Sequence, residues 1–115
     1  MADHTDWISL DDDNFEAEVL HHTGPVMVVF WSDQRGSCHI MAPVINRVAS
    51  VFTGRIRVGR LDIDDHLALP RRYGIHTVPT LVFFAKGQIM DQVQGVISTR
   101  ELTAKLKTLL GSVDT

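Results

Sequence analysis

The sequence predicts an α/β domain with a central mixed sheet of about five strands and helices on both faces. Two near-continuous apolar runs, Val26–Trp31 and Leu81–Ala85, are strand-sized and suit strands that are buried on both faces. Around them, patterns typical of strands and helices follow the order strand, helix, strand, helix, strand, helix, strand, strand, helix. This alternation indicates a sheet covered by helices on both sides.

The first third of the chain predicts two strands separated by a helix. Trp7–Leu10 is short and alternates weakly, which is typical of an edge strand. Acidic residues precede helically spaced apolar ones, and Asp13 and Glu16 have capping-box spacing, so we expect a helix over about Asp12–His21. Pro25–Trp31 then predicts a central strand.

The middle of the chain predicts helix, strand and helix. Apolar residues recur with a period near 3.6 over Cys38–Phe52, which indicates a long helix that ends at Thr53–Gly54. Ile56–Asp62 alternates and follows one helix after the central strand, so the two strands should be parallel with a right-handed crossover. His66–Tyr73 predicts a short helix, which Pro70 breaks internally.

The last third predicts a β-hairpin and a helix. Thr80–Ala85 and Ile89–Gln94 flank a tight turn and should pair antiparallel. Ser98 and Glu101 have capping-box spacing and predict the start of the last helix, which should fray from Gly111. The core face of this helix is expected to consist of Leu102, Leu106, Leu109 and Leu110.

Length and composition predict one domain over residues 1–115 with a core of about 7–110. A net charge of −3 does not favour nucleic acid as a partner. The start of the chain lacks the basic and apolar regions of a secretory signal, and the longest apolar runs are too short to cross a bilayer. We therefore expect a monomeric cytoplasmic protein that binds neither nucleic acid nor membrane.

The segment that carries chemistry is the turn Arg35–Cys38, between the central strand and the long helix. Cys38 is the only cysteine of the chain, so an internal disulfide is excluded. It lies where the helix is expected to begin. Free N–H groups and the helix dipole at such a position stabilise a thiolate, which is the nucleophilic form of the thiol.

This segment resembles the active-site segment of the thioredoxin family. In that family a buried strand runs into Trp-Cys-Gly-Pro-Cys, and the helix that follows carries Ala-Pro. Phe30–Trp31, Gly36, Cys38 and Ala42–Pro43 match this pattern in type and spacing. The order of predicted elements also resembles the thioredoxin fold, from about Trp7 to Leu110. The resemblance implies a thioredoxin-like fold.

Two further segments resemble the substrate groove of that family. Val78-Pro79-Thr80 is similar to the cis-proline segment, whose backbone pairs with the substrate chain, and Gly95 matches a glycine that keeps the groove shallow. The alternative is that the turn residues only shape loops. The resemblance implies a peptide-binding site made by Trp31, Arg35, Gly36, Ser37, Val78, Pro79 and Gly95.

The chain departs from the family pattern where the chemistry lies. Arg35 replaces the first cysteine, so Arg-Gly-Ser-Cys stands in place of Cys-Gly-Pro-Cys, and Val29 replaces a buried acid. An arginine cannot attack a disulfide, so the ordinary dithiol cycle is unavailable. Arg35 instead suits a carboxylate or phosphate, or it is a solvated side chain. A third interpretation is that Arg35 is a local variant of a dithiol protein.

Two functions remain open. The first is a degenerate thioredoxin-like protein that binds extended protein segments near the Arg35–Cys38 turn, with dithiol-disulfide reductase activity lost or strongly reduced. The alternative is a monothiol disulfide oxidoreductase in cell redox homeostasis, in which Cys38 forms mixed disulfides that an external thiol resolves. Whether the chain is an enzyme therefore depends on Cys38. This residue is either a residual catalytic thiol or a small buried apolar group.

No cofactor or metal is expected. The six histidines are scattered over different predicted elements, and none has the spacing of a ligand pair on one helix face. His39 follows Cys38 directly, but adjacent residues on a helix point in different directions.

Overall fold

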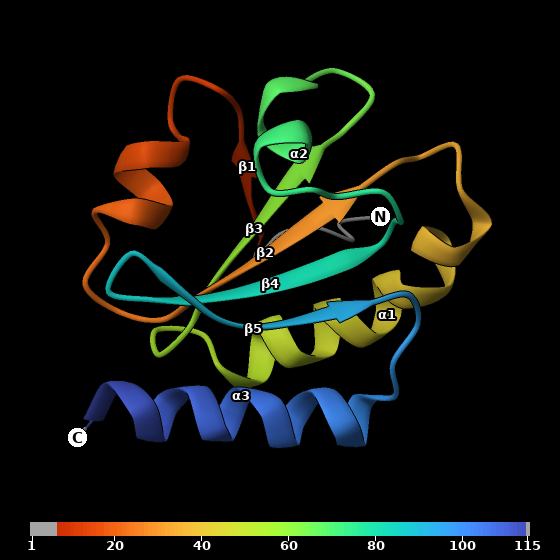
Figure 1. Cartoon of the computed structure of the whole chain (residues 1–115). Helices are drawn as coiled ribbons and strands as arrows, with labels where there is room; N and C mark the ends of the chain where they lie inside the picture. The colour runs from red at the N-terminus through yellow and green to blue at the C-terminus, as the bar shows by residue number, and fades with distance from the viewer. Residues whose placement is uncertain (1–6, 115) are drawn as a thin grey trace.

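A computed structural model describes residues 7–114 of the chain and shows a five-stranded mixed sheet (Figure 1). The strand order is β1-β3-β2-β4-β5. β2 and β1 each pair parallel with β3, whereas β4 pairs antiparallel with both β2 and β5. The strands are β1 (Trp7–Leu10), β2 (Val26–Trp31), β3 (Arg57–Asp62), β4 (Thr80–Ala85) and β5 (Gln88–Gln94).

Helices cover both faces of this sheet. α1 and α3 lie together on one face, and η1 and α2 lie on the other (Figure 1). This arrangement confirms the predicted α/β class, and β1 is an edge strand as its sequence indicated. Among residues 7–114, no helix combines the length and the apolarity that a membrane span requires. The helices are η1 (Glu16–Leu20), α1 (Gly36–Val51), α2 (Ala68–Arg72) and α3 (Thr99–Asp114).

β2 is the most completely buried strand, and it holds the centre of the sheet. All of its side chains are between 0 and 1% exposed, because β3 and β4 flank it and helices cover both of its faces. Phe30 lies opposite Leu61 of β3 and Thr80 of β4. A strand in which every residue is apolar, with no alternating polar residues, is typical of a position where both faces are buried. The end of β2 at Trp31 is therefore fixed in space.

The predicted helix over Asp12–His21 is wrong in its first half. Asp11 Oδ1 accepts the backbone N–H groups of Asp13 (2.9 Å) and Asn14 (2.8 Å), and Asn14 Oδ1 accepts that of Asp11 at 2.8 Å. These bonds form a turn, and only η1, a single π-helical turn, follows it. The predicted capping box of Asp13 and Glu16 is absent, because Asp11 already satisfies the free N–H groups.

The other helix boundaries differ less from the prediction. α2 begins at Ala68, so Pro70 lies in its first turn, where the missing N–H costs no helical hydrogen bond. The Ser98 hydroxyl accepts the Glu101 N–H at 3.1 Å, which confirms the predicted cap of α3. α3 continues past Gly111, where fraying was predicted, because one glycine costs a helix only about 1 kcal/mol.

The hairpin between β4 and β5 turns at two residues with positive φ. Lys86 has φ of 53° and Gly87 has φ of 79°, which is the backbone form that a two-residue hairpin requires. A Cβ atom at Gly87 would lie 2.5 Å from the carbonyl oxygen of Leu20. The tip of the hairpin therefore packs tightly against the end of η1, and glycine is required there.

Gly87→Ala should lower the free energy of unfolding by about 1–3 kcal/mol, since it combines backbone strain with a clash. Gly74→Ala is the matched control, because Gly74 also has positive φ (65°) but a Cβ atom there would meet nothing within 4 Å. Denaturant unfolding measures both. Equal losses of unfolding free energy in the two variants would show that the clash with Leu20 does not contribute to the effect of Gly87→Ala.

Candidate functional site

The candidate site begins where β2 ends. The chain turns after Trp31 and enters α1 through Arg35, an N-cap residue with extended backbone (φ −109°, ψ 126°). The Arg35 N–H donates to the Ser32 carbonyl, and the Cys38 N–H donates to the Arg35 carbonyl, both at 3.2 Å. The first turn of α1 carries no acidic residue, and no side chain caps it.

Cys38 is buried beneath this turn. Its side chain is 0% exposed, and its Sγ accepts the Ser32 N–H at 3.5 Å. Burial raises the pKa of the thiol, and the Ser32 N–H and the Arg35 charge offset this only in part. The pKa thus moves in the direction opposite to the one that a helix N-terminus favours. The neutral thiol is the stable form in this environment.

Two segments that are distant from the turn in the sequence lie beside it. The Ser37 hydroxyl donates to the Val78 carbonyl at 3.0 Å, which ties the start of α1 to the segment before β4. The Val78–Pro79 peptide bond is cis. The Gly95 N–H donates to the Pro79 carbonyl at 2.8 Å, and Gly95 has φ of 84°. The turn and the two segments predicted to form the groove are therefore adjacent.

Gly36 and Arg35 are exposed at the tip of the turn, whereas Val78 and Pro79 are buried. A Cβ atom at Gly36 would meet nothing within 4 Å. The sequence prediction placed all of these residues on the binding surface. In the structure the side chains of Val78 and Pro79 are buried and do not form part of an exposed surface.

Trp31 supports the turn from below instead of lining its surface. Its side chain is 1% exposed, and its Nε1–H donates to Asp33 Oδ1 at 2.8 Å. The Arg60 guanidinium lies over the Trp31 ring at 5.0 Å and contacts the Asp33 carboxylate at 3.3 Å. Direct contact between the Trp31 side chain and a ligand, as the sequence prediction implied, does not fit this burial.

Arg60 also supports the turn, and the sequence analysis did not single it out. β3 pairs with β2 so that Arg60 lies opposite Val29, two residues before Trp31. This juxtaposition brings the guanidinium to the aromatic ring and to Asp33. The only sequence signal was the alternation of β3, which does not identify the neighbour.

Two polar side chains complete the support. Ser32 is 1% exposed; its hydroxyl donates to Asp64 Oδ2 at 2.7 Å and accepts the Gln34 N–H at 3.1 Å. The His39 ring lies 2.9 Å (Nε2) from the Asp33 carbonyl oxygen. His39 thus binds the backbone of the turn, in agreement with the expectation that it does not act on Cys38.

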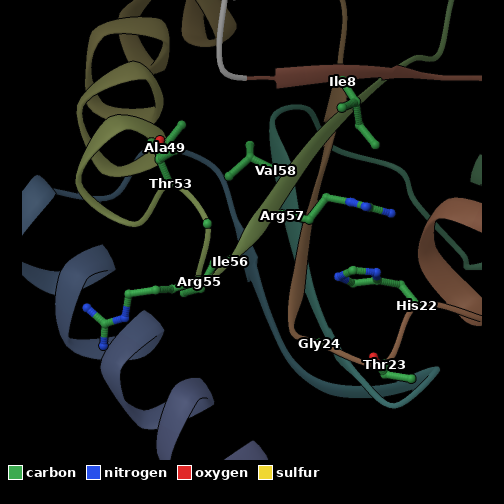
Figure 2. Close-up of a pocket in the computed structure, with 11 residues that line it drawn as sticks. Ile8, His22, Thr23, Gly24, Ala49, Thr53, Arg55, Ile56, Arg57 and Val58 are labelled. Atoms are coloured by element: carbon green, nitrogen blue, oxygen red, sulfur yellow. The ribbon is translucent and has the colours of Figure 1, made fainter.

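A separate hollow of about 500 Å³ lies at the opposite end of the sheet, where β2 and β3 begin (Figure 2). The His22 ring and the Arg57 side chain lie next to each other there. Burial and the Arg57 charge lower the pKa of His22, so its ring is neutral near pH 7. Arg57 itself is paired with Glu18 at 2.9 Å. This hollow shares no residue with the turn.

Within residues 7–114, no three His, Cys, Asp or Glu side chains lie close enough together to hold a metal ion. His4, one of the six histidines, lies outside the described residues.

The model of the family described as Thioredoxin matches residues 6–108. This chain belongs to the thioredoxin family. It is 42% identical to a thioredoxin of Thiocapsa roseopersicina over 82 residues, which cover 71% of this chain and 90% of that protein. It is 36% identical to a thioredoxin of Acidithiobacillus ferridurans (88% and 94% covered) and 35% identical to one of Pseudomonas aeruginosa (92% and 96% covered). The predicted thioredoxin family and fold are confirmed.

The buried hydroxyl of Ser32 should be important for the stability of this thioredoxin-family turn. Ser32→Ala removes two hydrogen bonds, so the free energy of unfolding should fall by about 1–2 kcal/mol. Ser50→Ala is the control, since Ser50 is exposed on α1. Denaturant unfolding measures both variants. An unchanged midpoint for Ser32→Ala would contradict the structural role of this hydroxyl.

Proposed function

We propose that this chain binds extended protein segments beside the Arg35–Cys38 turn and that its dithiol-disulfide reductase activity is lost or strongly reduced. The observation that carries this proposal is the state of the only thiol. Cys38 is fully buried, its pKa is raised, and Arg35 stands where the family has its first cysteine. A thiol that is inaccessible and protonated is a poor nucleophile.

A second thiol is also required for dithiol turnover. In that cycle one thiolate attacks a disulfide to form a mixed disulfide, and a neighbouring thiol then displaces the product. The chain has a single cysteine, so the second step has no internal nucleophile. Binding of a chain segment needs neither step, and the segments that bind substrate in the family are adjacent here.

The backbone beside the turn supports binding of an extended segment. No N–H partner for Val78 is found among the hydrogen bonds of residues 7–114, although its side chain is buried. A backbone N–H that has no partner next to a turn is suited to pairing with an incoming strand. Gly95 leaves open space beside this position, because a Cβ atom there would meet nothing within 4 Å.

The alternative is a monothiol oxidoreductase, and the relatives named thioredoxin favour a redox role. In this reaction the Cys38 thiolate attacks one sulfur of a partner disulfide and expels the other as a thiolate. An external thiol then attacks the Cys38 sulfur of the mixed disulfide and releases the partner as a thiol. A second external thiol attacks the resulting mixed disulfide, which regenerates the Cys38 thiol and joins the two external thiols as a disulfide. The charges of Arg35 and Arg60 and the Ser32 N–H support this alternative, since each lowers the pKa of Cys38.

A disulfide-reduction assay with dithiothreitol as the reductant tests the leading proposal. The wild-type chain should add little to the rate of dithiothreitol alone. Arg35→Cys places a thiol at the position of the first cysteine and should raise the rate by at least about tenfold, because the dithiol cycle becomes possible. Rapid turnover by the wild type would contradict the proposal.

The pH dependence of Cys38 labelling separates the two functions. Because burial raises the pKa of Cys38, half-maximal labelling of the native chain should occur at higher pH than in denaturant. Rapid labelling of the native chain below pH 8 would support the monothiol enzyme instead.

The same shift affects stability. A raised native pKa means that the unfolded thiol ionises first, so the contribution of Cys38 to stability is complete below the unfolded pKa. It is lost as the pH rises through the native pKa. The unfolding free energy of the wild type relative to Cys38→Ala should therefore fall above about pH 8.5.

A further inference from the structure

We propose that the segment bound beside the turn carries an acidic side chain, which pairs with Arg35. This inference rests on the proposed function, and it adds the chemical class of the partner. It depends on three features of the described surface: exposed apolar side chains, a backbone N–H that has no partner, and a cation that has no acidic partner.

The exposed apolar side chains lie around the turn. Ile40 is 64% exposed and Val96 is 55% exposed. Ile40 follows Gly36 by one helical turn, so the two lie on the same side of α1. The Ile97 N–H contacts Met41 Sδ at 3.4 Å, which holds the chain next to Val96 against the helix next to Ile40.

This surface suits a polypeptide better than a small molecule. Three pockets of about 280 to 500 Å³ lie elsewhere in the described part of the chain, and none includes a residue of the turn. Exposed apolar side chains next to a backbone N–H without a partner are typical of sites that accept an extended chain. The Ser37 hydroxyl already donates to the Val78 carbonyl, so the N–H of Val78 is the backbone group left for a ligand. This N–H donor and the exposed Arg35 guanidinium favour ligands that bring acceptors.

The positive charge of Arg35 determines which kind of side chain the bound segment should carry. Arg35 is exposed, and within residues 7–114 no carboxylate lies within 4 Å of its guanidinium. The nearest acid in the sequence, Asp33, is held by Trp31 and Arg60 instead. The first turn of α1 has no acidic residue either. A planar guanidinium binds a carboxylate through two parallel hydrogen bonds, so Asp or Glu of the partner fits this position.

The test uses three capped octapeptides with the same Val- and Thr-rich sequence, in which one central residue is Glu, Gln or Lys. Binding to the isotope-labelled full chain is followed by the amide NMR shifts of Val78 and Gly95 at low ionic strength. The Glu peptide should bind about fivefold more tightly than the Gln peptide, and the Lys peptide should bind most weakly. At about 1 M salt, where the screening length is about 3 Å, this preference should disappear.

Two variants isolate the role of Arg35. Arg35→Gln should bind the Glu and Gln peptides with equal affinity. Arg47→Gln is the matched control, because Arg47 is exposed on the same helix, three turns away from the site. It should keep the fivefold preference, since a distant charge contributes little at this range.

The outcomes separate the inference from the proposed function. Equal shifts at Val78 and Gly95 with all three peptides would overturn the acidic partner and leave segment binding intact. The absence of shifts with every peptide would overturn both. A preference for Glu that survives in Arg35→Gln would show that another group selects the charge, which also contradicts the inference.

Discussion

The site depends on the burial of one strand. β2 lies between β3 and β4 with both faces covered, so its last residue, Trp31, has a fixed position. The chain must then reverse and return as α1, whose apolar stripe packs on the same sheet. This stripe includes Cys38, so packing and not redox chemistry decides where the sulfur lies. Burial raises the pKa of this thiol, and the Ser32 N–H and the nearby cations offset this only in part.

The charged side chains around the turn do not all pair with one another. Arg60 stacks on Trp31 and pairs with Asp33, which in turn accepts the Trp31 indole N–H. These contacts neutralise Asp33 and hold the turn from beneath. Arg35 at the tip has no such partner among the described residues. In the proposed function a cation replaces the nucleophile, and recognition of an acidic segment replaces attack on a disulfide.

Sequence patterns predicted the strands to within about one residue, because a run buried on both faces or an alternating edge leaves a clear periodicity. They failed over Asp12–His21, where acids with capping-box spacing also suited a turn, and Asp11 formed the turn instead. Local propensity does not distinguish these alternatives, since both satisfy the same free N–H groups. The sequence did not single out Arg60 for another reason: its neighbours come from β2 and the turn after it, about thirty residues earlier in the chain.

The sequence by itself determined the thioredoxin family, the α/β fold and the absence of a second thiol, because these follow from periodicity, motif spacing and residue identity. The tertiary structure alone decided three properties of the site. It showed that the pKa of Cys38 is raised, that the Trp31 side chain is buried, and that the Ser37 hydroxyl donates a hydrogen bond to the Val78 carbonyl. Each depends on desolvation or on contacts between distant segments, and neither is encoded in local spacing. The motif around Cys38 therefore predicted where the site lies, whereas packing decided how deeply its sulfur is buried.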